Sequence, residues 1–128
     1  MIVSDRHQFG DNCRRVAEVL QRVSDKWSIL LVVLLEHGPR RFNDLKRSVP
    51  GISQRMLTLT LRGLERDGLV GRAVVASVPP RVEYVLTDLG RSFAAPARAL
   101  HGWVEGNIPA IDAARARHDA AQAEKAAP

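Results

Sequence analysis

GISQRMLTLTLRGLERDG, residues 51–68, is the stretch that decides the fold. Ser53 is a residue type that caps helices, and the helix that it predicts runs to Asp67, where Gly68 closes it. Apolar side chains recur along this helix at helical spacing: Leu57, Leu61 and Leu64, with Met56 beside them. The opposite face carries polar side chains: Gln54, Arg55, Thr58 and Arg62. The pattern predicts a helix that packs on a core and presents its polar face outward.

The segments before residue 51 predict further helices and a short strand. The expected elements are a helix from Cys13 to about Val23 capped by Asn12, a helix from Asp25 to His37 capped by Ser24, a short strand at Arg40–Phe42, and a brief helix from Asp44 to Ser48 capped by Asn43. The second of these helices is apolar on nearly all sides, which is typical of a buried helix. A turn is expected at 49–52, because the residue before a proline is pushed out of helical geometry.

After residue 68 the period changes from helical to two. We expect a strand at 69–75, a loop at 76–80 that holds two prolines, and a strand at 81–86. A last helix starts at Thr87 and runs past Trp103, and is expected to end before Pro109. The sequence predicts one mainly α domain at 1–109 with a small β-hairpin (α+β), and an alanine- and charge-rich tail at 110–128 that is partly helical or frayed.

This order of elements is the winged helix-turn-helix pattern, in which the second helix of the motif lies in the major groove of DNA. Arginine and glutamine can contact guanine and adenine edges in pairs of hydrogen bonds, and a helix start suits a phosphate. The candidate DNA-binding residues are Ser53, Gln54, Arg55, Thr58 and Arg62 on the helix, Arg81 beside the wing tip, and Arg41, next to Arg40, ahead of the motif. Arg62, Arg40 and Arg41 also suit a simple solvated role, and Arg81 also suits an ion pair with an acidic neighbour.

The composition bounds the classes of function. The chain has 128 residues, with 19 Lys and Arg against 14 Asp and Glu and a formal net charge of +5. A basic balance favours a polyanionic partner, with nucleic acid first. Met1–Arg6 lack the apolar segment of a signal peptide, and the longest apolar run, Ile29–Leu35, is far shorter than the ~20 residues that span a bilayer. We therefore expect a cytoplasmic protein with no membrane partner.

Enzyme chemistry is not predicted. The histidines His7, His37, His101 and His118 do not fall at metal-ligand spacing with a second ligand, and no glycine loop for phosphates is present. We expect no catalytic residue, no metal and no cofactor. Cys13, the single cysteine, has two interpretations: a redox or electrophile sensor whose thiolate Arg14 and Arg15 would favour, or a small buried apolar residue.

Two apolar stripes exceed what a chain of this size needs for its own core, which favours a homodimer. The expected interface residues are Val16, Leu20 and Val23 on the first helix and Phe93, Leu100 and Trp103 on the last.

Several segments in this order resemble the HxlR-type winged helix regulators, over roughly residues 13–103. They are Cys13, DKWSIL at 25–30, RFNDL at 41–45, GISQRMLT at 51–58, LERDGLV at 64–70 and PPRVEYVLTDLG at 79–90. The resemblance implies a homodimer formed by the first and last helices on a near-palindromic operator. It also implies repression of nearby genes that a small electrophile or other effector relieves. This family commonly has an acidic residue where Gly63 stands.

Two alternatives stay open from the sequence. One is a ligand-gated regulator of the related MarR type, and the other is a winged helix that binds protein and not DNA. The basic face at 54–62 favours DNA over protein.

Overall fold

The computed structural model describes residues 11–127 of the chain. Its elements are α1 (Asp11–Val23), α2 (Lys26–Leu35), β1 (Arg40–Arg41), α3 (Phe42–Ser48), α4 (Gln54–Arg66), β2 (Val70–Val75), β3 (Arg81–Leu86) and α5 (Asp88–Ala126). The predicted mainly helical fold with a hairpin wing is confirmed. Residues 1–6, on which the expectation of no signal peptide rests, and His7 lie outside the described residues.

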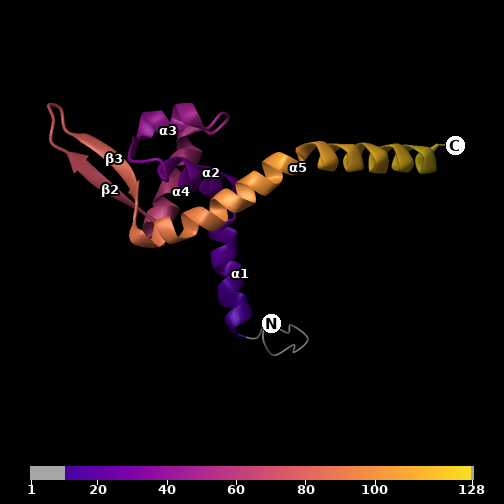
Figure 1. Cartoon of the computed structure of the whole chain (residues 1–128), viewed down its shortest axis with the longest axis horizontal. Helices are drawn as coiled ribbons and strands as arrows, with labels where there is room; N and C mark the ends of the chain where they lie inside the picture. The colour runs from indigo at the N-terminus through magenta and orange to yellow at the C-terminus, as the bar shows by residue number, and fades with distance from the viewer. Residues whose placement is uncertain (1–10, 128) are drawn as a thin grey trace.

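The core forms around α2, as its all-round apolar sequence predicts. Leu31 and Val32 of α2 are fully buried, and Leu57, Leu61 and Leu64 of α4 are at most 1% exposed. The first part of α5 crosses α2 and buries Ala94 and Ala97 against it. The helix-turn-helix helices α3 and α4 therefore rest on a scaffold made by α2 and the start of α5 (Figure 1).

A three-stranded antiparallel sheet in the order β1-β3-β2 makes the wing. Val70 pairs with Leu86 at its base, and Val75 pairs with Arg81 at its tip. Exposure along one face of β3 rises from 5% at Leu86 to 41% at Val82. The hairpin therefore grows out of the core and projects from the helices into solvent (Figure 1).

Two joints fix how α4 sits between α3 and the wing. Gly51, with φ +87°, follows Pro50 in a turn closed by a hydrogen bond from Ile52 N–H to the Val49 carbonyl at 3.3 Å. Gly68, with φ +79°, ends α4, while Leu69 N–H donates to the Leu64 carbonyl at 2.9 Å. These are a type II turn and a Schellman ending, both of which need a residue that tolerates positive φ.

The sequence misplaced several helix caps. Asp25, and not Ser24, caps α2, because its Oδ2 accepts from Trp27 N–H at 3.2 Å while the Ser24 hydroxyl turns back to the Leu20 carbonyl. α2 also ends at Leu35, before His37. Asn12 lies inside α1, and α3 starts at Phe42, so the predicted cap Asn43 lies inside α3. The residue that stands at the α3 start, Arg41, makes no side-chain cap.

The predicted end of the last helix before Pro109 is wrong, because α5 continues through Pro96 and Pro109 to Ala126. Proline removes one helical hydrogen bond, but its φ suits a helix. Both prolines are exposed, and the residues after Pro109 are rich in alanine and other strong helix formers with no turn signal. The distal half of α5 extends away from the rest of the molecule (Figure 1). Whether residues 110–128 are separate from the domain in function stays a prediction.

Candidate DNA interface

The outward face of α4 is one continuous surface. The leucines on the inner side of α4 are buried, so the opposite side of the helix faces solvent. Five side chains on that side line a shallow hollow: Gln54, Arg55, Thr58, Leu59 and Arg62. Four of them are the predicted base-contacting residues. Leu59 was not predicted, although it follows Arg55 by one helical turn, which places it at the edge of this face.

The start of α4 is set up for a negative charge. The Ser53 hydroxyl accepts from Met56 N–H at 3.0 Å and keeps its own proton free to donate. The remaining N–H groups of a first turn have no partner within a helix, and this first turn has no acidic side chain. The positive end of the helix dipole is therefore available to a phosphate beside Ser53.

Thr58 is more constrained than its neighbours. It is half-buried, and its hydroxyl donates to the Gln54 carbonyl at 2.9 Å. The hydroxyl proton is therefore used within the helix, and Thr58 offers outward an oxygen that can accept and a methyl group.

The cations near α4 divide into committed and free groups. Seven ion pairs occur within residues 11–127, and none of them involves Arg55, Arg62 or Arg81. Arg81 is exposed at the first position of β3, next to the wing tip. Arg41 is half-exposed in β1, with its Nε 3.7 Å from Asp44 Oδ2, and Asp44 also pairs with Arg47. Arg41 therefore shares its charge with an acid of α3.

The wing is tied to α4 by a pair that the sequence did not predict. Arg72 Nε of β2 lies 3.1 Å from Glu65 Oε1 of α4, and Glu65 is only 26% exposed at its side chain. The pair borders a small cleft with Arg62, Phe42 and Tyr84. The wing thus has a polar attachment to the helix in addition to its apolar base.

Away from α4, apolar side chains stay exposed on two helices. On α1 these are Val16, Val19 and Leu20, and on α5 from residue 100 onward they are Leu100, Trp103, Val104 and Ile108, each 42–59% exposed. Four of the six predicted dimer residues belong to these two stripes. The other two, Val23 and Phe93, pack against the core of their own chain.

A family model described as HxlR-like helix-turn-helix matches residues 22–112, most of the chain. The chain belongs to this family. The uncharacterized HTH-type transcriptional regulator YtfH of Escherichia coli (strain K12) is 41% identical to this HxlR-like chain over 107 residues, 84% of each protein. The HxlR-like chain is therefore a DNA-binding transcriptional regulator.

Solved structures agree with this family. The transcriptional regulator ytfH from Salmonella typhimurium superposes with a TM-score of 0.72 at 42% identity, covering 78% of this HxlR-like chain and 89% of that one. The redox regulator HypR in its oxidized form gives a TM-score of 0.68 at 43% identity, covering 73% of this chain and 96% of that one.

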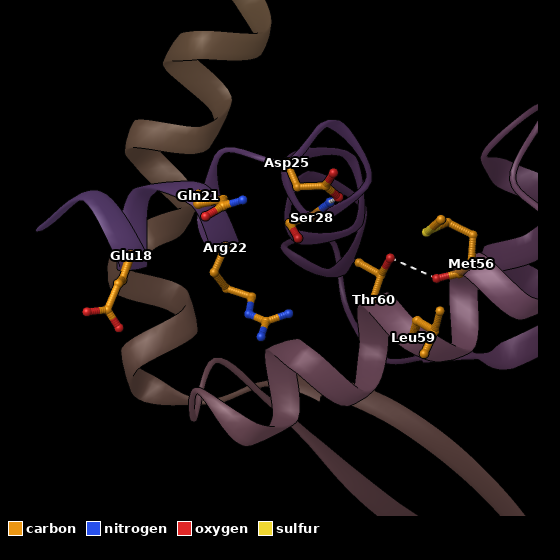
Figure 2. Close-up of a pocket in the computed structure, with 8 residues that line it drawn as sticks. All are labelled: Glu18, Gln21, Arg22, Asp25, Ser28, Met56, Leu59 and Thr60. Carbon is orange, nitrogen blue, oxygen red and sulfur yellow. Dashed lines mark hydrogen bonds between the residues drawn. The ribbon is translucent and has the colours of Figure 1, made fainter. Parts of the chain in front are cut away.

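A pocket of about 420 Å³ separates the first helix of this HxlR-like chain from α4 (Figure 2). Its lining comes from α1 (Glu18, Gln21, Arg22), the start of α2 (Asp25, Ser28) and α4 (Met56, Leu59, Thr60). The Arg22 guanidinium occupies the space over Gly63, where a Cβ would lie 2.3 Å from its Nη1. Its Nε lies 3.0 Å from Asp67 Oδ2. Arg22 therefore pairs with an acid at the end of α4, although Gly63 has no acidic side chain.

Cys13 is a free, half-buried thiol near the start of α1. It lies three residues before Val16 and seven before Leu20, on the face of α1 that carries the exposed stripe. Arg15, one of the two arginines expected to favour its thiolate, has Nη1 2.9 Å from Glu18 Oε2. A sensor thiol needs to be exposed and a structural cysteine is buried, so the half-buried position of Cys13 does not select between the two interpretations.

One ion pair links the two helices of the scaffold. Arg98 of α5 donates to the Glu36 carboxylate just after α2, and this hydrogen bond, together with the nearby positive charge, lowers the pKa of Glu36 below its usual range. Within residues 11–127 no three His, Cys, Asp or Glu side chains gather as a metal site. No helix of that same stretch has the length and apolarity needed to cross a membrane.

Proposed function

We propose that this regulator acts as a homodimer on a near-palindromic operator, with the α4 helix of each subunit in successive major grooves ~34 Å apart. The observation that carries the proposal is the outward face of α4, where Arg55 and Arg62 have no acidic partner within the described chain. A regulator of this kind works in the cytoplasm on DNA, and needs no cofactor or catalytic residue.

The roles on α4 follow from donor and acceptor chemistry. Arg55 donates two hydrogen bonds to O6 and N7 of a guanine, and Gln54 pairs with an adenine edge. Thr58 accepts from a base amino group or packs its methyl group, since its own proton is held by the Gln54 carbonyl. Ser53 and the first-turn N–H groups bind a phosphate, and Arg62 reaches a base or phosphate farther along the groove.

The wing and β1 supply contacts that position the protein without sequence preference. Arg81, free of ion pairs and next to the tip, contacts a phosphate or enters the minor groove. Arg41 contacts the DNA backbone at the cost of loosening its pair with Asp44, so its contribution is the smaller of the two.

The dimer forms through the exposed stripes of α1 and α5, including Val16, Leu20, Leu100 and Trp103. Val23 and Phe93 support the interface from behind, because they pack on the core beneath it. Residues 110–126 extend the dimerisation helix beyond the domain, and we assign the tail at 110–128 no contact with DNA.

Regulation is proposed to be repression that a signal relieves. The pocket between α1 and α4 is the candidate effector site, because a ligand there would press on the dimer helix and the DNA helix at once. HypR, a relative of known structure, is a redox regulator. By analogy Cys13 responds to oxidants, and with one thiol per chain its oxidised form is a disulfide between subunits, an adduct with a small thiol, or a sulfenic acid.

The test uses an operator selected from random duplexes with the wild-type protein. Binding to this operator and to a scrambled duplex is titrated against salt for wild type, Arg55→Ala, Arg81→Ala and Arg117→Ala. Loss of a paired base contact costs ~1–3 kcal/mol of binding free energy on the operator. Arg55→Ala should therefore reduce the difference in affinity between the operator and the scrambled duplex. Arg81→Ala weakens both and flattens the salt slope by about one unit.

Arg117→Ala is the matched control, since it removes the same charge from the exposed far part of α5. It should bind both duplexes nearly as wild type does. If Arg55→Ala behaves like Arg117→Ala, α4 does not read bases through Arg55.

A further inference from the structure

Leu59 is an exposed apolar side chain at the edge of a cationic surface, beside Arg55 and Arg62. It is 48% exposed, whereas Leu57 and Leu61 on the inner side of the same helix are at most 1% exposed. Arg55 precedes it by one turn and Arg62 follows it by three residues, so both arginines are its neighbours on the helix surface. All three line the same hollow.

A single exposed leucine is ordinary on a protein surface, but its place here is specific. On one side of Leu59 lie Arg55 and Arg62, which are donors that face DNA in the proposed function, and on the other side lies the pocket beside α1. The major groove presents polar edges at every base pair and one apolar group, the C5 methyl of thymine. An apolar side chain among the base-contacting residues therefore has one partner of matching chemistry in that groove.

We propose that Leu59 contacts the C5 methyl group of a thymine and is a specificity-determining residue. The proposal rests on the insertion of α4 into the major groove. Leu59 lies ~6 Å along the helix axis from Arg55, which corresponds to about two base-pair steps. The thymine is therefore expected within about three base pairs of the guanine that Arg55 contacts.

The expected effect is set by one buried methyl group. Transfer of a methylene-sized group from water to an apolar contact changes an equilibrium constant about fourfold. Each half-site contributes one such contact, so a symmetric operator that loses both methyl groups should bind about 15-fold more weakly.

The experiment replaces thymine by uracil, which removes only the methyl group and keeps base pairing. Uracil is introduced at each thymine of the selected operator in turn, in both half-sites together. Binding is measured for wild type, Leu59→Ala and Met56→Ala. Met56 is a matched control: it is 39% exposed on the same helix, but lines the pocket toward α1 and not the hollow of Leu59.

The proposal predicts one thymine position at which uracil weakens wild type and Met56→Ala about 15-fold and leaves Leu59→Ala unchanged. The proposal is overturned if no uracil substitution weakens operator binding by the wild type. It is also overturned if the same uracil substitution weakens binding by Leu59→Ala as much as binding by the wild type. Leu59 also borders the pocket beside α1, so sedimentation accompanies the titration. If Leu59→Ala dissociates the dimer and keeps the uracil effect, Leu59 is an interface residue and the proposal is wrong.

Failure of this proposal and failure of the proposed function give different results. If wild type enriches no duplex over random DNA, both are overturned. If wild type binds its selected operator with the Arg55 dependence described above but ignores uracil, only the role of Leu59 is lost. Leu59→Ala is expected to fold, because the side chain is exposed and alanine favours a helix, and circular dichroism verifies this.

Discussion

Replacing Gly90 by alanine should destabilise the fold through a clash with main chain. Gly90 is buried in the first turn of α5, three residues after the cap Thr87, whose hydroxyl accepts from Gly90 N–H. A Cβ on Gly90 would lie 2.0 Å from the Leu69 carbonyl oxygen and 3.1 Å from Leu86 Cδ2. The same carbonyl accepts from Thr87 N–H at 3.1 Å, so the clash falls on the joint that fastens α5 to the base of the wing.

The magnitude follows from the distance that must open. Moving the Cβ from 2.0 Å to an ordinary contact shifts α5 against Leu69 by about 1 Å, and no side-chain rotation can absorb this because the atom is backbone. Overpacking of this kind costs ~1–3 kcal/mol, and the weakened Thr87 bond adds ~1 kcal/mol. Alanine returns at most ~1 kcal/mol of helix propensity. The net loss is about 2 kcal/mol, or a Tm lower by about 8 °C.

Thermal unfolding followed by circular dichroism measures this effect. Gly102→Ala is the matched control, because Gly102 lies in the same helix with nothing within 4 Å of its Cβ position. It should melt at or slightly above wild type. All samples need the same protein concentration, since dimerisation makes Tm concentration-dependent. If Gly90→Ala melts at or above wild type, the close approach of α5 to Leu69 is wrong.

Three other predictions test the interface, the thiol and the scaffold. Sedimentation at micromolar concentration should show a dimer that Trp103→Glu dissociates and that Val78→Glu, a charge on an exposed apolar wing residue, leaves intact; a wild-type monomer would refute the interface. Cys13→Ser should keep DNA binding and lose oxidant-induced release, and an unchanged response to oxidant would make the cysteine structural. Because Arg98 lowers the pKa of Glu36 in the folded state, their contribution is present above about pH 4.3, the ordinary glutamate value, and is lost as pH falls further. The Tm difference between wild type and Glu36→Gln should therefore be present at pH 7, shrink as the pH falls below about 4.3, and vanish once Glu36 is protonated in the folded state as well; a difference that stays constant as the pH falls would exclude the pair as its cause.

The parts of the fold that the sequence predicts are those set by local pattern. The burial of α2 and of one face of α4 follows from apolar spacing, and Gly51 and Gly68 mark joints that need positive φ. Cap positions could not be predicted from residue type alone. Ser24 and Asp25 are both good caps, and only the geometry of the α1–α2 turn selects Asp25. The helix continues through Pro109 because the residues on both sides have high helix propensity. The prediction that it ends there gave too much weight to the single proline.

In the candidate site, too, the residues that share one helix face could be predicted, and the pairs made between elements could not. Arg55 and its neighbours on the polar face could be found from the sequence, because helix geometry alone brings them together. Leu59 lies on that face by the same geometry and was missed because it is apolar. The partners Asp44 for Arg41 and Glu65 for Arg72 could not be separated from other acids in the sequence, since these pairs depend on how β1, α3, α4 and β2 are placed.

The central claim is that the two α4 helices of a dimer read bases in successive major grooves. Methylation interference at guanine N7 on the selected operator tests it most directly, because N7 is one of the two atoms that Arg55 is proposed to contact. The account predicts two clusters of interfering guanines one helical turn, ~34 Å, apart, and their loss with Arg55→Ala but not with Arg117→Ala. Interference that is absent, or that persists unchanged in Arg55→Ala, would contradict it.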